Sequence, residues 1–221
     1  MIVSELISDY VPSVTSNDST TRALDWMNEF KLSQLPVVDG GSYQGLITEN
    51  DILDADSLEV SVGDIQFKGW DSAFIHDENH LYDALDLMAN LNLEVLPVLG
   101  EDDRYLGVIT FREMAPYLGR LFAVHQTGGI LVLEVPRNGY SLSEIGRITE
   151  SENIKVLSLY LWAHPDGHVV WITLKLNAED LSRVSAAFER FEYTIIRAYN
   201  KVEPIDDYRK NIDALMKYLN M

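Results

Sequence analysis

Residues 35–39 read Leu-Pro-Val-Val-Asp, and residues 45–48 read Gly-Leu-Ile-Thr. The same pair of stretches recurs 61 to 62 residues later, as Leu-Pro-Val at 96–98 and Gly-Val-Ile-Thr at 107–110. Further upstream, Ala-Leu-Asp occurs at 23–25 and again at 84–86. The matches keep their order, with one inserted residue. An internal repeat therefore decides the fold of the first half of the chain.

Each copy of the repeat predicts the order β-α-β-β-α, because helical spacing of apolar residues alternates with short β-rich runs and turns. In the first copy these elements are expected at 10–14, 23–30, 35–38 and 44–48, with a second helix from 49. In the second copy they are expected at 73–76, 81–91, 95–99 and 106–110, with a helix from 111. A unit of about 60 residues buries little core alone, so the two should pack together as one α/β (α+β) module.

These motifs resemble the cystathionine-β-synthase (CBS) motif, and the resemblance covers residues 1 to about 118. It implies two motifs, at about 1–57 and 58–118, paired into one compact module. It also implies that the module binds an adenine nucleotide or a related adenosyl ligand in a cleft and regulates another protein.

The resemblance further implies which residues of the first copy face the ligand. Thr48 ends a strand and Asp51 follows in the first helical turn, where the carboxylate can accept hydrogen bonds from ribose hydroxyls. The Thr48 hydroxyl and the helix N-terminus suit a phosphate oxygen. Leu35 and Pro36 belong to the same motif. An alternative stays open, in which Thr48 and Asp51 only form a capping box.

The second copy departs from this signature. Thr110 matches, but Glu113 stands where the family has Asp, so its carboxylate reaches about one methylene further. Arg112 is the best local cation for a phosphate.

Acidic residues are concentrated in this half. The whole chain has 221 residues and a formal net charge of −18. Residues 1–118 hold 22 acidic and five basic residues, a net charge of −17, and the remainder carries −1. This balance argues against binding to nucleic acid or to an anionic membrane. It also favours AMP, Mg²⁺-bound ADP or ATP, or S-adenosylmethionine over a bare polyphosphate.

The second half predicts the order β-α-β-β-α-β of a ferredoxin-like fold. Strands are expected at 129–135, 156–162, 169–176 and 193–199. One helix should start at a capping box formed by Ser141 and Glu144, and Asn177 should cap the other, which runs through Phe188. The domain limits are then 1–118, a linker at 119–128, 129–200, and a C-terminal segment at 201–221.

Residues 129–200 resemble an ACT-like domain, and the combination is similar to acetoin-utilisation-type CBS–ACT proteins. ACT domains often bind amino acids at a turn after the first strand. Asn138 and Gly139 occupy that turn here, without the family's usual Asp-x-x-Gly form. The alternative is a sheet used only for dimerisation. The C-terminal segment predicts an amphipathic helix, with apolar residues at Ile205, Tyr208, Ile212, Leu215 and Leu219.

The sequence lacks the signatures of an enzyme. It contains no nucleophile elbow, P-loop or dinucleotide fingerprint, and its five histidines lack metal-ligand spacing. With no Cys, no secretory signal and no apolar run of membrane-spanning length, a soluble cytoplasmic protein is expected. We expect no catalytic residues, no metal site and no required cofactor.

The leading hypothesis is a non-catalytic, allosteric regulator that senses an adenine nucleotide, forms a homodimer and acts on an unidentified protein. The alternatives are a ligand-free dimeric adaptor and an enzyme with an unrecognised site.

Overall fold

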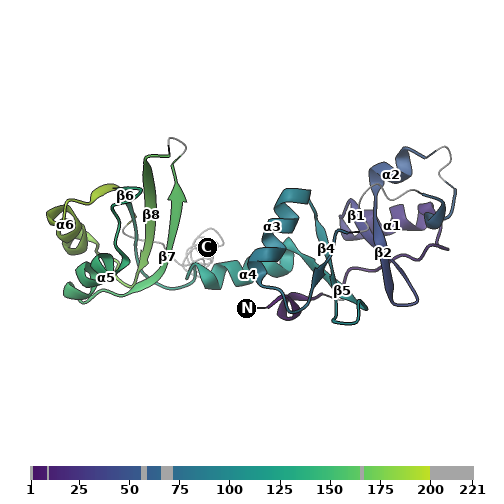
Figure 1. The fold of residues 1–221 in the computed structure, drawn as a ribbon, viewed down its shortest axis with the longest axis horizontal. Helices are drawn as coiled ribbons and strands as arrows, with labels where there is room; N and C mark the ends of the chain where they lie inside the picture. The colour runs from purple at the N-terminus through teal and green to yellow at the C-terminus, as the bar shows by residue number, and fades with distance from the viewer. Residues whose placement is uncertain (1, 9, 56–58, 66–71, 165–166, 200–221) are drawn as a thin grey trace, which may run out of the picture. The chain divides into compact units, whose positions relative to one another are not determined.

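A computed structural model describes residues 2–8, 10–55, 59–65, 72–164 and 167–199. The chain forms two compact units, Met1–Pro116 and Tyr117–Met221 (Figure 1). The amphipathic helix predicted at 201–221 lies outside the described residues.

The first unit contains both copies of the repeat. The first copy comprises the 3-10 helix η1 (Val3–Leu6), α1 (Thr20–Phe30), β1 (Gln34–Asp39), β2 (Ser42–Thr48) and α2 (Glu49–Leu53). The second comprises the 3-10 helix η2 (Val62–Asp64), β3 (Ile75–His76), α3 (Leu81–Leu91), β4 (Val95–Leu99), β5 (Tyr105–Thr110) and α4 (Phe111–Leu121). The predicted α/β order is confirmed. The extended segment at 10–14 is reduced to one parallel bridge between Val14 and Val37.

The two copies agree in backbone detail. Strands β1 and β2 pair antiparallel with a bulge after Val37, and β4 and β5 pair in the same way with a bulge after Val98. Lys31 and Asn92 end α1 and α3 in the left-handed region, at φ 56° and 52°. The sequence repeat is therefore also a structural repeat.

Residues related by the repeat meet where the copies join. The backbone N–H of Ser33 donates to Oε2 of Glu94 at 2.6 Å, and the N–H of Glu94 donates to Oε1 of Gln34 at 3.1 Å. We call these three residues the repeat seam. Because Ser33 and Glu94 are 61 residues apart, the seam lies at the approximate two-fold axis between the copies.

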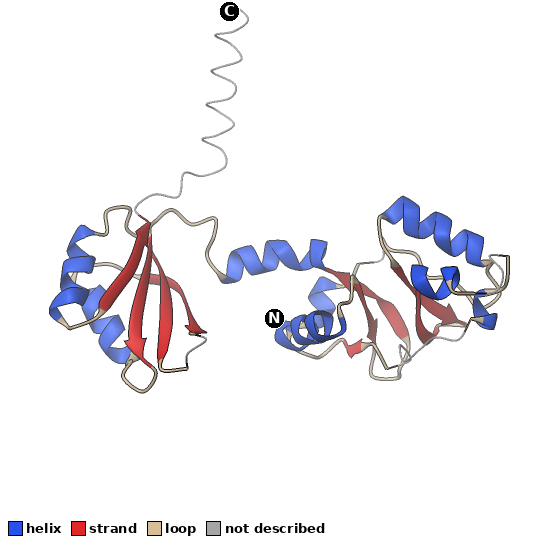
Figure 2. Ribbon diagram, turned by 90° about the horizontal axis from the view of Figure 1, so that it is seen from above, coloured by secondary structure: helices blue, strands red, loops and turns tan. Residues whose placement is uncertain are grey.

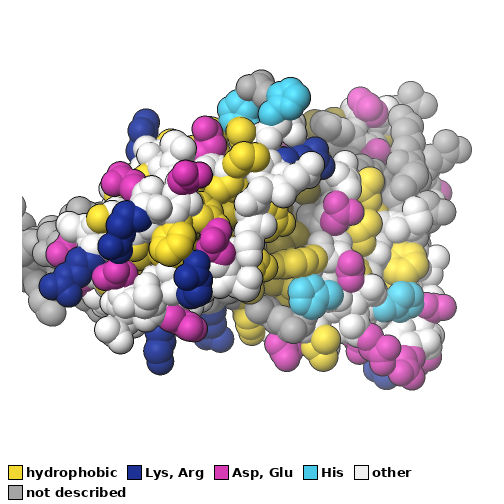
Figure 3. Space-filling view, turned by 60° about the vertical axis from the view of Figure 1, so that its left-hand side comes forward, with side chains coloured by type: hydrophobic (Ala, Val, Ile, Leu, Met, Phe, Trp, Pro, Cys, Tyr) yellow, Lys and Arg dark blue, Asp and Glu magenta, His cyan; other side chains and the backbone are white. Residues whose placement is uncertain are grey.

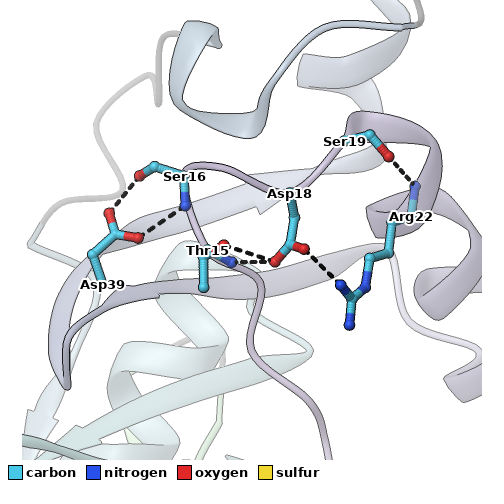
Figure 4. Close-up of polar contacts among 6 residues, drawn as sticks. All are labelled: Thr15, Ser16, Asp18, Ser19, Arg22 and Asp39. Carbon is cyan, nitrogen blue, oxygen red and sulfur yellow. Dashed lines mark hydrogen bonds and ion pairs between the residues drawn. The ribbon is translucent and has the colours of Figure 1, made fainter.

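The segment that leads into α1 is held by carboxylates (Figure 4). Asp18 accepts hydrogen bonds from the N–H and hydroxyl of Thr15, at 2.8 and 2.9 Å, and its other oxygen lies 2.8 Å from Arg22. Asp39, at the end of β1, accepts from the N–H and hydroxyl of Ser16. The start of α1 is thereby fixed against the first strand.

These contacts predict an acid-sensitive contribution to stability. The Thr15 N–H, its hydroxyl and Arg22 hold the pKa of Asp18 below its ordinary value, although partial burial opposes them. A lowered pKa stabilises the fold above the unfolded value of about 3.9, and this contribution is lost as the pH falls through the lowered pKa. Asp18→Asn should therefore cost about 1 kcal/mol of unfolding free energy at pH 7 and flatten the acid limb of the stability profile. Denaturation at pH 2 to 7 measures both.

A matched control is Asp25→Asn, which changes an exposed carboxylate on the same helix. An unchanged acid limb in Asp18→Asn, or an equal change in Asp25→Asn, would contradict the prediction.

The second unit is a four-stranded antiparallel sheet with two helices. Its elements are β6 (Ile130–Pro136), α5 (Leu142–Ser151), β7 (Val156–Ala163), β8 (Val169–Leu176), α6 (Ser182–Arg190) and β9 (Thr194–Tyr199). The strand order β7-β8-β6-β9 is that of a ferredoxin-like fold, as predicted. Helices α5 and α6 lie on the same side of the sheet (Figure 2). Their buried side chains form one core with the inward-facing strand residues, among them Leu133, Ile148, Ile172 and Phe188.

Details at the ends of elements differ from the sequence predictions. Ser141 caps α5 through the N–H of Glu144, but the Glu144 carboxylate accepts from the Tyr193 hydroxyl at 2.9 Å instead of closing a capping box. Helix α6 begins only at Ser182, and Asn177 accepts from the N–H of Lys155 at 2.7 Å. The predicted cap at Asn177 is therefore wrong, because its side chain joins two loops. Helix α4 also continues to Leu121, into the predicted linker.

Candidate functional site

Thr48 and Asp51 form a reciprocal pair at the start of α2. The N–H and hydroxyl of Thr48 donate to Oδ2 of Asp51 at 3.0 and 2.7 Å, and the Asp51 N–H donates to the Thr48 hydroxyl at 3.0 Å. This is the capping box that the sequence left open as an alternative. It satisfies the first turn of the helix locally.

Thr110 and Glu113 form a similar pair at the start of α4. The Thr110 hydroxyl donates to Oε2 of Glu113 and accepts from the Arg112 N–H at 3.1 Å. The longer Glu side chain therefore reaches the same threonine position that Asp51 reaches in the first copy. Thr110 is 8% exposed, so its hydroxyl lies at the base of a surface depression rather than on open surface.

A pocket of about 270 Å³ opens beside Thr110. We call it the second-motif pocket. It is lined by Tyr10, Val11, Phe30, Lys31, Leu32, Glu94, Thr110, Phe111, Arg112 and Glu113. It therefore combines an apolar, aromatic wall with two cations and two carboxylates. Its volume lies just below the usual range for small-molecule sites, about 300–1,000 Å³.

The aromatic wall comes from the first copy. Tyr10 and Phe30 pack edge to face, with ring centroids 5.2 Å apart. Phe111, from the second copy, is half exposed at the mouth. A planar base can pack against such a wall, because aromatic rings provide a large flat contact area.

The cations of this pocket stand out against the acidic first half. Only five basic residues occur in residues 1–118, and two of them, Lys31 and Arg112, line the pocket. In the right-hand part of Figure 3, acidic side chains are spread over the surface, with few Lys or Arg among them. The two cations balance the carboxylates of Glu94 and Glu113 in the lining, so the pocket repels an anion less than the surrounding acidic surface does.

Sequence reasoning identified Thr110, Arg112 and Glu113 but missed Tyr10, Phe30, Lys31 and Glu94. The pocket is composite, because the end of α1 in one copy faces the start of α4 in the other. The repeat could have indicated this arrangement, because residues related by an approximate two-fold axis can meet at that axis. Ser33 and Glu94 do so at the seam, and Glu94 also lines the pocket.

The repeat also indicates what surrounds the Thr48–Asp51 pair. The offsets relate Lys31 to Asn92 and Arg112 to Asn50, so the corresponding position carries neutral amides where the second-motif pocket carries cations. The counterpart of Tyr10 is residue 71, which lies outside the described residues. The two copies therefore differ in charge at equivalent positions.

The other predicted site residues lie elsewhere. Leu35 is 0% exposed and Pro36 is buried, so both side chains belong to the core of the first unit. Asn138 and Gly139 lie in an exposed turn after β6, in which the Gly139 N–H donates to the Pro136 carbonyl at 2.8 Å. Ligand contact by these four residues stays a prediction.

Within the described residues, no three His, Cys, Asp or Glu side chains are grouped to hold a metal ion. Nor does any helix of the described ranges have the length and apolar character needed to cross a bilayer.

Known proteins match the first unit. Inosine-5'-monophosphate dehydrogenase of Korarchaeum cryptofilum is 31% identical over 120 residues, which cover 52% of this chain and 25% of that protein. The enzyme of the same name from Methanocaldococcus jannaschii is 29% identical over 111 residues, covering 50% and 22%. The chain thus spans about a quarter of the length of these relatives.

Among solved structures, a CBS domain pair/ACT domain protein from Thermotoga maritima is 25% identical, with a TM-score of 0.49 over 53% of this chain and 96% of that one. CBSX2 in complex with AMP is 22% identical, with a TM-score of 0.46 over 53% and 95%. The family model of the CBS domain matches twice, at residues 3–58 and 62–120. These two matches cover more than half of the chain, which therefore belongs to the CBS domain family.

Proposed function

We propose that the chain is a non-catalytic regulatory protein that senses an adenine nucleotide in the second-motif pocket. The observation that carries the proposal is the meeting of Lys31, Arg112 and an aromatic wall beside Thr110. In this arrangement the base packs against Phe30 and Tyr10, and the phosphate is held by the two cations. The ribose hydroxyls face Glu113.

The pocket favours a ligand with a single phosphate. Its volume of about 270 Å³ is small for a nucleoside triphosphate, and the surrounding acidic surface repels a high negative charge. AMP is thus the first candidate, while S-adenosylmethionine and Mg²⁺-bound ADP or ATP are the others. The AMP complex of CBSX2 names the same ligand for that protein.

The site prediction shifts from the first copy to the second. Thr48 and Asp51 carry the complete family signature. However, the positions equivalent to Arg112 and Lys31 are Asn50 and Asn92 in this copy, which are not cations. A phosphate therefore gains more at Thr110 and Arg112, because charge-assisted hydrogen bonds are about twice as strong as neutral ones.

Arg112→Ala tests this assignment. A hydrogen bond to a charged group contributes about 1.5–3 kcal/mol, so AMP affinity should fall by about 10- to 100-fold while adenosine affinity changes little. Calorimetry with AMP and adenosine measures both. Arg104→Ala is the control, because Arg104 belongs to the same unit and does not line the pocket.

Thermal unfolding with AMP, ADP, ATP and S-adenosylmethionine, each with and without Mg²⁺, tests the wider proposal. A ligand at 100 times its dissociation constant stabilises the native state by about 2.7 kcal/mol. If none of these ligands raises the unfolding temperature, the nucleotide-sensor proposal is wrong. Loss of the shift in Asp51→Ala but not in Arg112→Ala would place the ligand at the first copy.

One observation favours a second candidate, a ligand-free dimeric adaptor. In both copies the threonine and the acid already bind each other, so neither carboxylate needs a ligand to be satisfied. Under either function we expect a cytoplasmic homodimer that acts on a separate protein. An enzyme would be revealed by product formation from one of the ligands above.

A further inference from the structure

The sheet of the second unit turns one face toward α5 and α6 and the other face away from them (Figure 2). Along β6 and β8, buried residues such as Leu133 and Ile172 alternate with less buried ones. The buried set packs in the core with the two helices, so the less buried set lies on the side away from them. We call this side the open face.

Aromatic side chains dominate the open face. Trp162 is 62% exposed, Tyr199 51% and Tyr160 42%. They line a groove of about 410 Å³ together with Val132, Trp171, Thr173, Ile196 and Arg197. At about 150–250 Å² for a whole aromatic side chain, the three exposed rings alone present about 230–390 Å². The largest apolar patch on a typical monomer is about 300–600 Å², so the open face has the size of a contact site.

The chain that enters the unit shows what this face accepts. The Ser158 hydroxyl donates to the Phe122 carbonyl at 2.9 Å, and the Phe122 and Tyr160 rings pack edge to face, with centroids 5.4 Å apart. One end of the open face thus already packs an aromatic ring from outside the sheet. A second copy would bring further rings, those of Trp162 and Tyr199, to the part that is still exposed.

The distribution of charge favours a second copy of the chain as the partner. Residues 1–118 carry a net charge of −17 and the remainder −1, so two copies repel each other least where their second units meet. A basic partner would instead be drawn to the first unit. Arg197 lines the groove, and next to it the Glu134 carboxylate accepts a hydrogen bond from Trp171 Nε1 at 2.9 Å. These opposite charges leave the groove without a net charge that would oppose self-association.

We propose that two copies of the chain form a homodimer by packing their open faces together about a two-fold axis parallel to the strands. The strand order β7-β8-β6-β9 then places β7 of each copy opposite β9 of its partner. The pairing register aligns four groove residues across the sheet, namely Tyr160, Thr173, Val132 and Arg197. Because this axis keeps the residues of one row at the same level, Arg197 comes to lie over the partner's Tyr160.

The charge of Arg197 selects this axis over the other one that faces two sheets together. A two-fold axis that runs across the strands at the same level would bring the two Arg197 side chains together, and like charges oppose association. With the axis parallel to the strands, each guanidinium instead meets an aromatic ring, which attracts it. The face is then complementary to itself, as a symmetric dimer requires.

Crosslinking of the full chain tests the contact without background, because the natural chain contains no Cys. Thr173→Cys lies in the middle of the groove, and with sheets about 10 Å apart its two copies come within reach of a short bismaleimide. Ala186→Cys is the matched control, because Ala186 is exposed on α6, on the helix side. Thr173→Cys should give a covalent dimer at least about 10-fold faster, since association brings the two thiols to a millimolar effective concentration. Equal rates would overturn the proposal.

Sedimentation of charge variants tests the arrangement of the two faces. Wild type should be a dimer at micromolar concentration, and Arg197→Glu should raise the dissociation constant at least about 10-fold. Arg183→Glu is the control, because it makes the same change of charge at an exposed position on α6 and should leave the dimer intact. Trp162→Ala should raise the constant at least about 30-fold, as expected for a central Trp. A monomeric wild type, or an equal loss in Arg183→Glu, would refute the proposal.

This dimer gives a surface to the homodimer expected under the proposed function, and its failure can be told apart from that of the nucleotide sensor. The groove belongs to the second unit and the second-motif pocket to the first. The AMP-induced rise in unfolding temperature should therefore persist in Trp162→Ala. A crosslinked dimer without an AMP response would support the dimer and refute the sensor, and a monomer with an AMP response would do the reverse.

Discussion

Replacing Phe188 by Ala is expected to lower the unfolding free energy of the second unit by about 3–5 kcal/mol. Phe188 lies on α6 and is 0% exposed, and its ring packs edge-on against Tyr193 with centroids 5.4 Å apart. Truncation removes a large apolar surface and leaves a cavity that the surrounding side chains fill only partly. Chemical denaturation followed by circular dichroism measures the loss.

Because the chain has two units, Phe188→Ala should affect the second unit and spare the first. The AMP response proposed for the first unit should persist in Phe188→Ala, because none of the residues that line the second-motif pocket belongs to the second unit. Phe191→Ala is the matched control, since Phe191 follows the same helix, is partly exposed and packs on Arg147. A destabilisation by Phe191→Ala as large as that by Phe188→Ala would contradict the assignment of Phe188 to the core.

Gly128→Ala is expected to destabilise the second unit by about 3 kcal/mol or more. Gly128 has φ 144°, a conformation that residues with a side chain rarely adopt, and an added Cβ would lie 1.9 Å from the Leu176 carbonyl oxygen. The strand end must shift to relieve this overlap. The shift would also disturb the hydrogen bond from Lys175 to the Gly128 carbonyl. Thermal unfolding of the variant measures the effect.

Gly146→Ala, in the same unit, is expected to have the opposite effect on stability. Gly146 lies inside α5, and an added Cβ would meet nothing within 4 Å. Because Ala favours helix over Gly by up to about 1 kcal/mol, this variant should be slightly more stable than wild type. If both glycine variants had the same effect, the steric argument for Gly128 would fail.

The fold was predictable where the pattern is local or repeated. The repeat predicted the doubled β-α-β-β-α order, and hydrophobic runs separated by turns predicted the ferredoxin-like order of the second unit. Asn177 was assigned wrongly because an Asn before a helical pattern is a common cap, whereas its actual partner, Lys155, is 22 residues away. Such a contact depends on how two loops meet in space.

The candidate site shows the same limit. The Thr110–Arg112–Glu113 cluster is contiguous in sequence and could be recognised. Lys31 and Phe30 belong to the other copy, and they reach the cluster only through the packing of the two copies. The acetoin-utilisation comparison and the domain limits at 118, 128 and 200 stay predictions.

The position of Glu94 gives the pocket a direct connection to the first copy. Its carboxylate accepts the Ser33 N–H, its own N–H is held by Gln34, and its side chain also forms part of the pocket wall. A ligand that draws this carboxylate toward itself has to lengthen or break the bond to Ser33. Ligand binding in the pocket would then directly weaken a hydrogen bond between the two repeats. Under the proposed function, Glu94 would link occupancy of the pocket to the contact between the repeats, because it belongs to both.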